Sequence, residues 1–531
     1  MVRDVELRAL QLTPFPPVIN GDITDTSTPP TPYASDSDTA SRPKIDRHHS
    51  SPPDGKNLPG SATRKPHSRH KRRPVSFHAR TSRLDSVNIH SQEQEFRGFF
   101  TLFWLAMAFY VILTVVENLE KRGTIISLGL FSIFSQDALA LMASDLVMVV
   151  LTGFGVILQK CVAARWIGGG AANAVQHLYQ AAFLSAAIYW TFWRDWPWVQ
   201  SGFFVLHTLV MLMKLHSYCA RNNELAAHHL HFEALEKELD ELTAKLKKLE
   251  DIPHDERHTL ECHVEHIRNE LKELDHELCP GKMRYPNNLT WANYIEYLFV
   301  PTLVYELEYP RTERVRPWYV FEKTVATLGT FLLLYLTAEH YIIPVLQDVN
   351  LSMFRMLLQL LFPFMIGYLL IFYIIFECIC NLFAELSCFA DRNFYDDFWN
   401  STSWDEFARK WNKPVHRFLL RHVYHSSVEA YNLSKINATL LTFLLSSCLH
   451  ELVMIVVSRR FRMLLFFLQM LQVPLMFLSR VPVVRQRKIL GNVVFWIGML
   501  TGPPLLGIVY SREAFKSAAV DAPDTDNIAL I

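Results

Sequence analysis

The sequence predicts an all-α protein that crosses a membrane several times. Half of its 531 residues are hydrophobic. Apolar stretches of about 20 residues, the length that spans a bilayer as a helix, recur along most of the chain. Lys and Arg gather in alternate segments between them, as in multi-pass proteins. Nine stretches qualify as spanning helices: 98–117, 138–159, 173–193, 198–218, 321–345, 353–388, 437–457, 460–479 and 489–510.

The basic residues near the ends of these stretches predict the orientation of the chain. The cluster within 64–73 places the N-terminus in the cytosol, and alternation then puts 219–322, 390–436 and 479–488 on the cytosolic side. The four basic residues in the last of these segments agree with this assignment. The arginine-rich turn at 459–462 would face the lumen, against the rule. Either that turn lies close to the cytosolic face or one stretch is re-entrant.

A membrane domain is predicted at 96–515, with a polar tail on each side. Residues 1–95 have too few apolar side chains to offset chain entropy, so a disordered cytosolic tail is expected. No signal-peptide core is found near the start, so the first spanning helix must direct insertion. Residues 516–531 form a short C-terminal tail. Within 222–280, leucines at heptad spacing on either side of Pro253 predict a cytosolic helical hairpin or a short intermolecular coiled coil.

The composition excludes some classes of function. The 52 basic and 52 acidic side chains balance, whereas a nucleic-acid-binding protein would have a basic excess. The eight cysteines are scattered, mostly in or beside apolar stretches, and show neither a disulfide framework nor paired metal-ligand spacing. We therefore expect no nucleic-acid partner and no metal site.

His450 and Glu451 lie in the middle of the otherwise uncharged stretch 437–457. An ionisable side chain at the centre of a bilayer costs about 3 kcal/mol on insertion scales, so such residues are functional-site candidates. Cys448 is two positions from His450 and points away from it, which excludes a Cys–His pair on this helix. Ser446 is four positions from His450 and shares its face.

This pattern leaves three roles open for His450. In the first, it activates Ser446 as a nucleophile, although no Gly-x-Ser-x-Gly turn surrounds that serine and serines in membrane helices usually bond to their own turn. In the second, it is a structural histidine bonded to a neighbouring helix. In the third, it is a general base that acts directly on a substrate hydroxyl, because neutral imidazole accepts a proton at cytosolic pH.

Further polar residues lie at 394–416, where the chain turns back toward the membrane. Aromatic residues spaced along 404–411 share one face of a helix that Pro414 ends, as expected for an amphipathic helix in the interface. That interpretation does not account for Asn412 and His416. The amide of Asn412 could donate to the oxyanion that forms on a carbonyl carbon during acyl transfer. A Tyr305/Glu306 pair close to Arg311 is interpreted as structural.

Three separated motifs resemble the membrane-bound O-acyltransferases, and within them the sterol and diacylglycerol acyltransferase branch. They are Phe394–Asn400 (FYDDFWN), Trp411–His416 (WNKPVH) and Leu449–Glu451 (LHE). Residues 301–311 are similar to the same branch, and 389–427 look most like fungal acyl-CoA:sterol acyltransferases. The likeness covers roughly residues 95–515.

The resemblance implies an enzyme of the endoplasmic reticulum membrane that esterifies the 3-hydroxyl of a membrane sterol with a long-chain acyl group. Acyl-CoA is then the co-substrate, no cofactor is needed, and the spanning helices surround an intramembrane reaction chamber. Such enzymes are typically homodimers or homotetramers. The resemblance makes His450 the catalytic base, assisted by Asn412. It implies binding of acyl-CoA or acceptor by Phe394, Tyr395, Asp397, Trp399, Asn400, Arg409, Trp411, His416, Lys435 and Ser446. Phe398 departs from the family motif, where a Trp with an indole N–H donor is usual.

Two other functions fit part of the same pattern. Diacylglycerol is also an apolar alcohol, so the same catalytic pair would serve a diacylglycerol acyltransferase, but the details of the fungal sterol type favour a sterol. A lipid or ion transporter also uses intramembrane His and Glu residues. It would be expected to show internal repeats or helices broken in corresponding halves, and the sequence shows neither.

Overall fold

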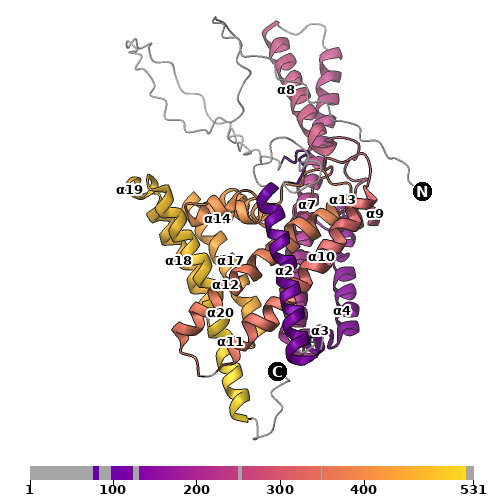
Figure 1. Ribbon diagram of the computed structural model, residues 1–531. Helices are drawn as coiled ribbons and strands as arrows, with labels where there is room; N and C mark the ends of the chain where they lie inside the picture. Colours follow the sequence, from indigo (N-terminus) through magenta and orange to yellow (C-terminus); the bar gives the residue numbers. More distant parts are fainter. Residues whose placement is uncertain (1–75, 83–96, 124–130, 249–253, 349, 522–531) are drawn as a thin grey trace, which may run out of the picture. The chain divides into compact units, whose positions relative to one another are not determined.

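The computed structural model describes residues 76–82, 97–123, 131–248, 254–348 and 350–521. This part of the chain is helical apart from turns, loops and two isolated bridges, which join Arg80 to Asp391 and Arg311 to Phe389 (Figure 1). The predicted all-α class is therefore confirmed.

Six helices or runs of helices in the described residues are long and apolar enough to cross a membrane. Each coincides with one of the predicted stretches. They comprise α4 (Ala138–Leu151) with α5 (Phe154–Ala163); α7 (Trp198–Lys248); α10 (Pro317–Thr337) with η1 (Ala338–Ile342) and α11 (Ile343–Gln347); α12 (Met353–Phe372) with η2 (Tyr373–Ile379) and α13 (Cys380–Leu386); α17 (Lys435–Ser458); and the first part of α20 (Lys488–Asp521).

The three other predicted stretches are also helical. They form α2 (Arg97–Arg122), α6 (Gly169–Trp193) and α18 (Leu464–Ser479). α18 has only 16 residues and begins later than expected. The part of the chain described here thus establishes six spans by length and composition, and the count of nine stays a prediction.

Short helices connect the spans or extend from them. They are α3 (Phe131–Ser135), α8 (His254–Leu278), α9 (Trp291–Phe299), η3 (Phe398–Asn400), α14 (Trp404–Trp411), α15 (Lys413–Phe418), η4 (Leu419–His425), α16 (Ser426–Ala430) and α19 (Pro482–Arg485). α20 continues past the predicted domain boundary at 515. Of the predicted N-terminal tail only 76–82 are described, and there the backbone N–H of Arg80 donates to the carbonyl of Ala390 (2.8 Å). The rest of that prediction lies outside the described residues.

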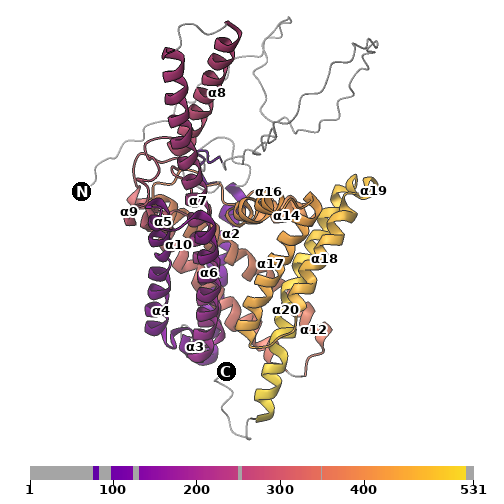
Figure 2. The same cartoon turned by 180° about the vertical axis from the view of Figure 1, so that it is seen from behind.

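The heptad leucines pack within this chain, as a hairpin of α7 and α8 (Figures 1 and 2). Leu235 on α7 and Ile267 and Leu274 on α8 form a buried apolar cluster between the two helices. Histidine–glutamate contacts flank that seam on both helices: His228 with Glu277 (2.8 Å), His231 with Glu270 (2.9 Å) and His263 with Glu238 (3.8 Å). Of the two predicted arrangements, the intramolecular hairpin is the one that this structure contains.

Three interhelical turns lie together at one end of the spans. Arg194 pairs with Asp137 (2.7 Å), and Arg459 forms an ion pair with Asp195 and donates to the carbonyl of Trp196 (3.1 Å). Alternation had placed these turns on the same, lumenal side. The arginine turn that breaks the basic-residue rule therefore lies with the other turns predicted to be lumenal, and one of its charges has a carboxylate partner.

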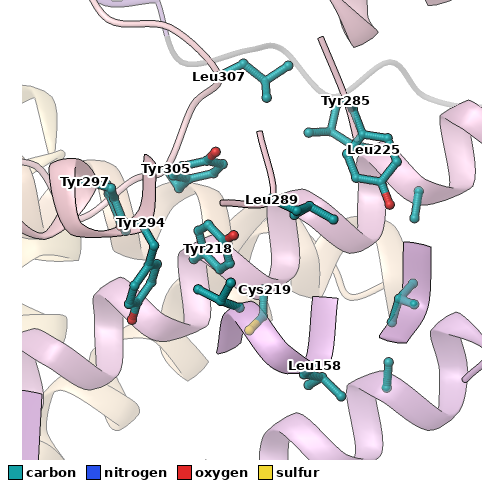
Figure 3. Close-up of a cluster of buried hydrophobic side chains, with 14 of the residues drawn as sticks. Leu158, Tyr218, Cys219, Leu225, Tyr285, Leu289, Tyr294, Tyr297, Tyr305 and Leu307 are labelled. Atoms are coloured by element: carbon teal, nitrogen blue, oxygen red, sulfur yellow. The ribbon is translucent and has the colours of Figure 1, made fainter. Parts of the chain in front are cut away.

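A cluster of tyrosines docks α9 and the loop that follows it onto α7 (Figure 3). The ring of Tyr218 on α7 meets the rings of Tyr294 and Tyr305 edge-on, with centroids 4.8 Å apart in both pairs. The hydroxyl of Tyr294 donates to the carbonyl of Thr152 (3.0 Å), and that of Tyr305 donates to the side chain of Asn293 (2.6 Å). Buried tyrosines are stabilising when the hydroxyl is bonded in this way.

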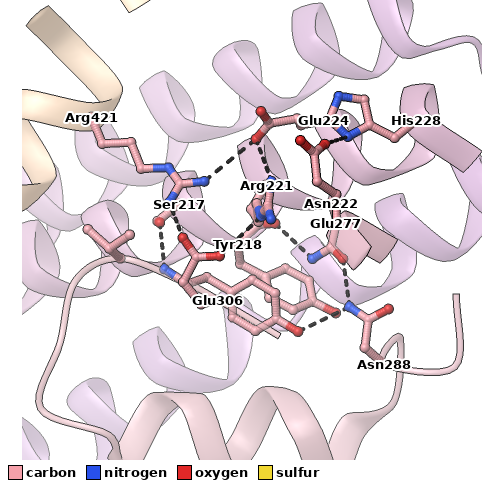
Figure 4. Close-up of polar contacts among 12 residues, drawn as sticks. Ser217, Tyr218, Arg221, Asn222, Glu224, His228, Glu277, Asn288, Glu306 and Arg421 are labelled. Atoms are coloured by element: carbon pink, nitrogen blue, oxygen red, sulfur yellow. Dashed lines mark hydrogen bonds and ion pairs between the residues drawn. The ribbon is translucent and has the colours of Figure 1, made fainter. Parts of the chain in front are cut away.

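A buried network of charges joins the same loop to α7 and η4 (Figure 4). Glu306 forms ion pairs with Arg221 (3.2 Å) and Arg421, and Glu224 lies 3.0 Å from Arg221 and 3.6 Å from Arg421. These side chains are between 9% and 15% exposed. These contacts agree with the structural role expected for Glu306. The expectation that Arg311 lies beside it is wrong, because the partners of Glu306 are Arg221 and Arg421.

Arg311 has other partners than Glu306. Its guanidinium pairs with Glu296 (2.6 Å) and donates to the carbonyl of Ser387 (2.5 Å). The turn at Pro310 carries Arg311 toward the end of α13, so it cannot serve the network on α7.

Glu306→Ala should destabilise the protein by about 3 kcal/mol, because two buried guanidinium groups lose a carboxylate that compensates them. The thermal unfolding midpoint of the full-length protein in detergent measures this. Glu261→Ala, which breaks the exposed Arg257–Glu261 pair on α8, is the matched control and should cost under about 1 kcal/mol. Equal midpoints for the two variants would contradict the assignment.

Candidate active site

His450 lies on α17 with its ring exposed, and one ring nitrogen is already engaged. Nδ1 is 2.8 Å from the carbonyl oxygen of Ser446, one turn earlier. Because a carbonyl can only accept, this contact places the proton on Nδ1 and leaves the lone pair on Nε2. Among the described residues, no neighbouring helix supplies a hydrogen bond to this ring. The geometry therefore fits a base that takes a proton through Nε2 better than it fits a structural histidine.

Ser446 contacts His450 through its backbone and not through its hydroxyl. A serine nucleophile needs its hydroxyl within hydrogen-bond reach of the base. Within the residues described, no such bond joins the Ser446 hydroxyl to the imidazole. The contacts do not assemble the Ser–His pair considered from the sequence.

Glu451 has a structural role, in contrast to its neighbour. Its carboxylate is 2% exposed and accepts hydrogen bonds from the backbone N–H groups of Met463 (2.9 Å) and Phe466 (3.0 Å), and from the hydroxyl of Tyr510 on α20 (2.8 Å). A carboxylate at the start of a helix satisfies N–H groups that have no partner within the helix. These three bonds account for an acidic residue in this apolar stretch without any catalytic role.

Asn412 ends α14 and caps α15. Its side-chain oxygen accepts from the backbone N–H of Val415 (3.1 Å), and its carbonyl accepts from the N–H of His416 (2.9 Å). Capping fixes the side chain, so the amide NH₂ group has a defined direction, and it has no hydrogen-bond partner among the described residues. The structure shows no direct contact between Asn412 and His450.

The motif Phe394–Asn400 forms a scaffold between two membrane helices. The hydroxyl of Tyr395 donates to the buried carboxylate of Glu377 on η2 (2.5 Å). The carbonyl of Trp399 accepts from Asn492 (3.0 Å) and Trp496 (3.2 Å) on α20. Phe394 is 2% exposed. The contacts of these residues are made with protein groups.

Asp397 and Asn400 are the more accessible members of the motif. Asp397 pairs with Lys410 (3.1 Å) and accepts from the Asn400 amide (3.4 Å). Partial burial would raise the pKa of Asp397, but the hydrogen bonds from Lys410 and Asn400 hold it below the ordinary value. The carboxylate therefore stays ionised and ties η3 to α14.

Phe398, which replaces the usual Trp, is buried in a group of aromatic rings. Its ring centroid lies 4.9 Å from Phe372, 5.0 Å from Trp411 and 5.3 Å from Trp399. Trp411 in turn stacks on Tyr368 at 4.6 Å. These neighbours are aromatic faces and edges, so the missing indole donor leaves the packing at this position intact.

The remaining predicted site residues differ in their surroundings. Arg409 is exposed and pairs with Asp405 (2.7 Å), and Lys435 is exposed at the first position of α17. His416 is half-buried on α15. Burial, and then the positive charges of Arg409, Lys413 and Arg417, lower the pKa of His416 below its ordinary value. A neutral imidazole at this position can both accept and donate a hydrogen bond.

The sequence reasoning missed a line of buried polar residues on the helix run from α12 to α13. Glu377, Asn381 and Glu385 are fully buried at four-residue spacing. The carboxylate of Glu377 accepts a hydrogen bond from the hydroxyl of Tyr395, and Glu385 pairs with Arg392 (2.5 Å) and Arg316 (2.9 Å). The spacing i, i+4, i+8 was visible within the apolar stretch 353–388 and marks one face that holds the motif.

Replacing Glu451 with alanine should lower stability by about 3–5 kcal/mol, since three buried donors lose their acceptor. His450→Ala, one residue away and exposed, should change it by under about 0.5 kcal/mol. Thermal midpoints of the two purified variants test this. If both melt together, Glu451 and His450 do not have the separate roles described here.

Comparison with known proteins gives the family of this chain. The profile of the membrane-bound O-acyltransferase family matches residues 185–512. A probable sterol O-acyltransferase 1 of Schizosaccharomyces pombe is 38% identical over 448 residues, covering 79% of this chain and 82% of the relative. A sterol O-acyltransferase 2 of Candida albicans is 33% identical over 82% of this chain and 78% of its own length. A diacylglycerol O-acyltransferase 1 of Dictyostelium discoideum is 35% identical over only 43% of this chain and 38% of its own.

The family profile covers more than half of the chain, and the sterol-named relatives align along most of their length. The chain therefore belongs to the membrane-bound O-acyltransferase family and is an acyltransferase.

Proposed function

We propose that this protein is an acyl-CoA:sterol O-acyltransferase in which His450 is the general base and Asn412 assists. The observation that carries the proposal is the ring of His450 on a membrane helix, exposed and held through Nδ1 by its own helix. A base of this kind needs access to the substrate together with a fixed tautomer. The contact with the Ser446 carbonyl favours one tautomer, and the exposure of the ring leaves it accessible to a substrate.

The reaction follows from the position of the lone pair. Nε2 of His450 takes the proton of the sterol 3-hydroxyl while the sterol oxygen attacks the thioester carbonyl. The new C–O bond forms, the C–S bond breaks, and the departing CoA thiolate recovers the proton from the imidazolium. The products are the steryl ester and CoA, and the exchange needs no oxidant or metal. Positioned proton transfer of this kind typically contributes about 10²–10⁴ in rate.

Asn412 would act on the oxyanion. Its oxygen is occupied as the cap of α15, so the amide NH₂ is the group left to donate to a substrate. A donor aimed at the developing negative charge is worth a few kcal/mol of barrier. His450 and Asn412 would thus meet through the substrate, since they share no direct bond.

The substrate contacts divide into two groups under this proposal. Arg409, His416 and Lys435 would contact the polar part of acyl-CoA, with Trp411 and Ser446 nearer the reacting carbonyl. The motif residues would act mainly by holding α14 and α15 in place, because their hydrogen bonds and ion pairs join them to neighbouring helices. They are Phe394, Tyr395, Asp397, Trp399 and Asn400. Acyl-CoA enters from the aqueous side and the sterol from the bilayer.

A sterol is favoured over diacylglycerol because the sterol-named relatives align along most of the chain, whereas the diacylglycerol-named relative aligns along less than half. We further propose the endoplasmic reticulum membrane as the location, a cytosolic N-terminus, nine spans around a reaction chamber and a homodimeric or homotetrameric assembly.

His450→Ala should abolish acyl transfer in microsomes without lowering the protein level. The assay offers ergosterol, cholesterol and diacylglycerol with labelled oleoyl-CoA and separates the esters. Cys448→Ala, an exposed change on the same helix, should keep wild-type activity. Residual activity near wild type in the His450 variant would refute the general-base role. Preferential labelling of triacylglycerol by the wild-type protein would show that diacylglycerol, and not a sterol, is the acceptor.

Asn412→Asp separates the two roles of Asn412. Aspartate caps a helix as well as asparagine does, so the thermal midpoint should stay unchanged. It has no NH₂ donor, so kcat should fall by about 10²–10³. Asn412→Ala, which removes both groups, should lose activity and about 1 kcal/mol of stability. An active Asp variant would exclude the amide from catalysis.

A further inference from the structure

Helices α14, α18, α19 and α20 lie close to one another (Figure 2), and a strongly basic pocket is lined by residues of all four and of the segments beside them. Its volume is about 300 Å³. Five cations line it, and Asp405 is the single carboxylate among its lining residues. The cations are Arg409, Arg480, Arg485, Arg487 and Lys488.

The one carboxylate does not balance these charges. Asp405 accepts from the hydroxyl of Ser403 (2.7 Å) and from Arg409 (2.7 Å). Burial would raise the pKa of Asp405, but these two donors, with the charge of Arg480, hold it below the ordinary value. Asp405 is therefore ionised and engaged with Arg409.

Among the described residues, the other four cations form no direct ion pair with a carboxylate, although the charge of Arg480 also acts on Asp405. Arg480 lies over the ring of Phe477 (5.6 Å to the centroid), which orients its guanidinium without neutralising it. Arg485, Arg487 and Lys488 are exposed. Four like charges around one small cavity repel one another, and an anion with two negative charges would remove most of that repulsion.

The wall of the pocket is fixed by close backbone contacts. A Cβ on Gly491 would lie 2.5 Å from the carbonyl oxygen of Thr402, so only glycine lets α20 approach this closely. At the next position, the amide of Asn492 donates to the carbonyls of Ser401 (2.9 Å) and Trp399 (3.0 Å). The first turn of α20, whose N–H groups favour an anion, is thereby fastened beside the cations.

The position and lining of the pocket indicate a lipid source for that anion. Lys488 begins the membrane-length part of α20 and Ser479 ends α18, so the pocket lies at the level where apolar helices meet polar headgroups. Exposed apolar side chains continue from it on both helices, at Phe477, Leu478 and Ile489. No aromatic ring lines the pocket to stack against a nucleotide base.

We propose that this pocket binds the phosphate of an anionic phospholipid, with the acyl chains lying against α18 and α20. A phosphomonoester headgroup matches the charge and the volume, and its tails match the apolar residues beside it. The chemistry of recognition is that of phosphate in general; the lipid is distinguished from free phosphate or CoA by the adjoining apolar surface. His450 is not part of this pocket, and of its five cations only Arg409 is shared with the acyl-CoA contacts proposed above.

The test uses the full-length protein in an uncharged detergent with dioctanoyl phosphatidate as the probe, and measures binding by native mass spectrometry. The variant Arg485→Gln/Arg487→Gln/Lys488→Gln should bind about a hundredfold more weakly, from about fivefold per cation. Lys237→Gln/Lys245→Gln/Lys247→Gln removes the same charge from the exposed face of the hairpin and should bind as wild type does. Dioctanoyl phosphatidylcholine, which has no net charge, should not compete.

Three outcomes would overturn the proposal. Wild-type binding by the pocket variant, or an equal loss in the hairpin control, would show that the lipid binds elsewhere or only through net charge. The third outcome is that inorganic phosphate or CoA displaces the probe at the same concentration as additional phosphatidate does. That result would assign the pocket to soluble phosphates. If the triple variant shows a lowered thermal midpoint, the single Arg487→Gln variant replaces it, with an expected loss of about fivefold.

Discussion

The presentation of His450 depends on the carboxylate beside it. Glu451 points to the buried side of α17, where it receives two backbone N–H groups near the start of α18 and the hydroxyl of Tyr510 on α20. A helix turns all its side chains together, so these bonds prevent α17 from rotating. The next side chain along is about 100° around the helix axis. Fixing Glu451 inward therefore fixes His450 on an exposed flank.

Hydrogen bonds to neighbouring helices also fix the part of the candidate site that contains Asn412. Tyr395 is bonded to Glu377 of η2, and the carbonyl of Trp399 is bonded to side chains of α20. The motif is thus pinned between two membrane helices, and α14 and α15 follow directly from it. Asn412, at the junction of α14 and α15, takes its orientation from this frame and from its own cap. Buried polar groups that are fully bonded specify one arrangement of the elements around them.

The sequence alone predicted the helices and the histidine, because both depend on local patterns. Runs of apolar residues mark helices of spanning length, and His450 stands out as a polar residue within one. The partners of the buried carboxylates were not predictable in the same way. Tyr510 is 59 residues from Glu451, and which helix faces the carboxylate depends on how the helices rotate and pack. For the same reason Glu306 was expected near Arg311, its neighbour in sequence, but it pairs with Arg221 and Arg421.

The unbroken length of α7 has a mechanical consequence. Its 51 residues form a rod of about 75 Å, from the turn that holds Arg459 to the hairpin with α8. The tyrosine cluster around Tyr218 packs against this rod between its two ends. A tilt of the hairpin by a few degrees displaces the opposite tip by a few ångströms. Because α6 and α17 both pack against α7, such a tilt would also shift their contacts with it.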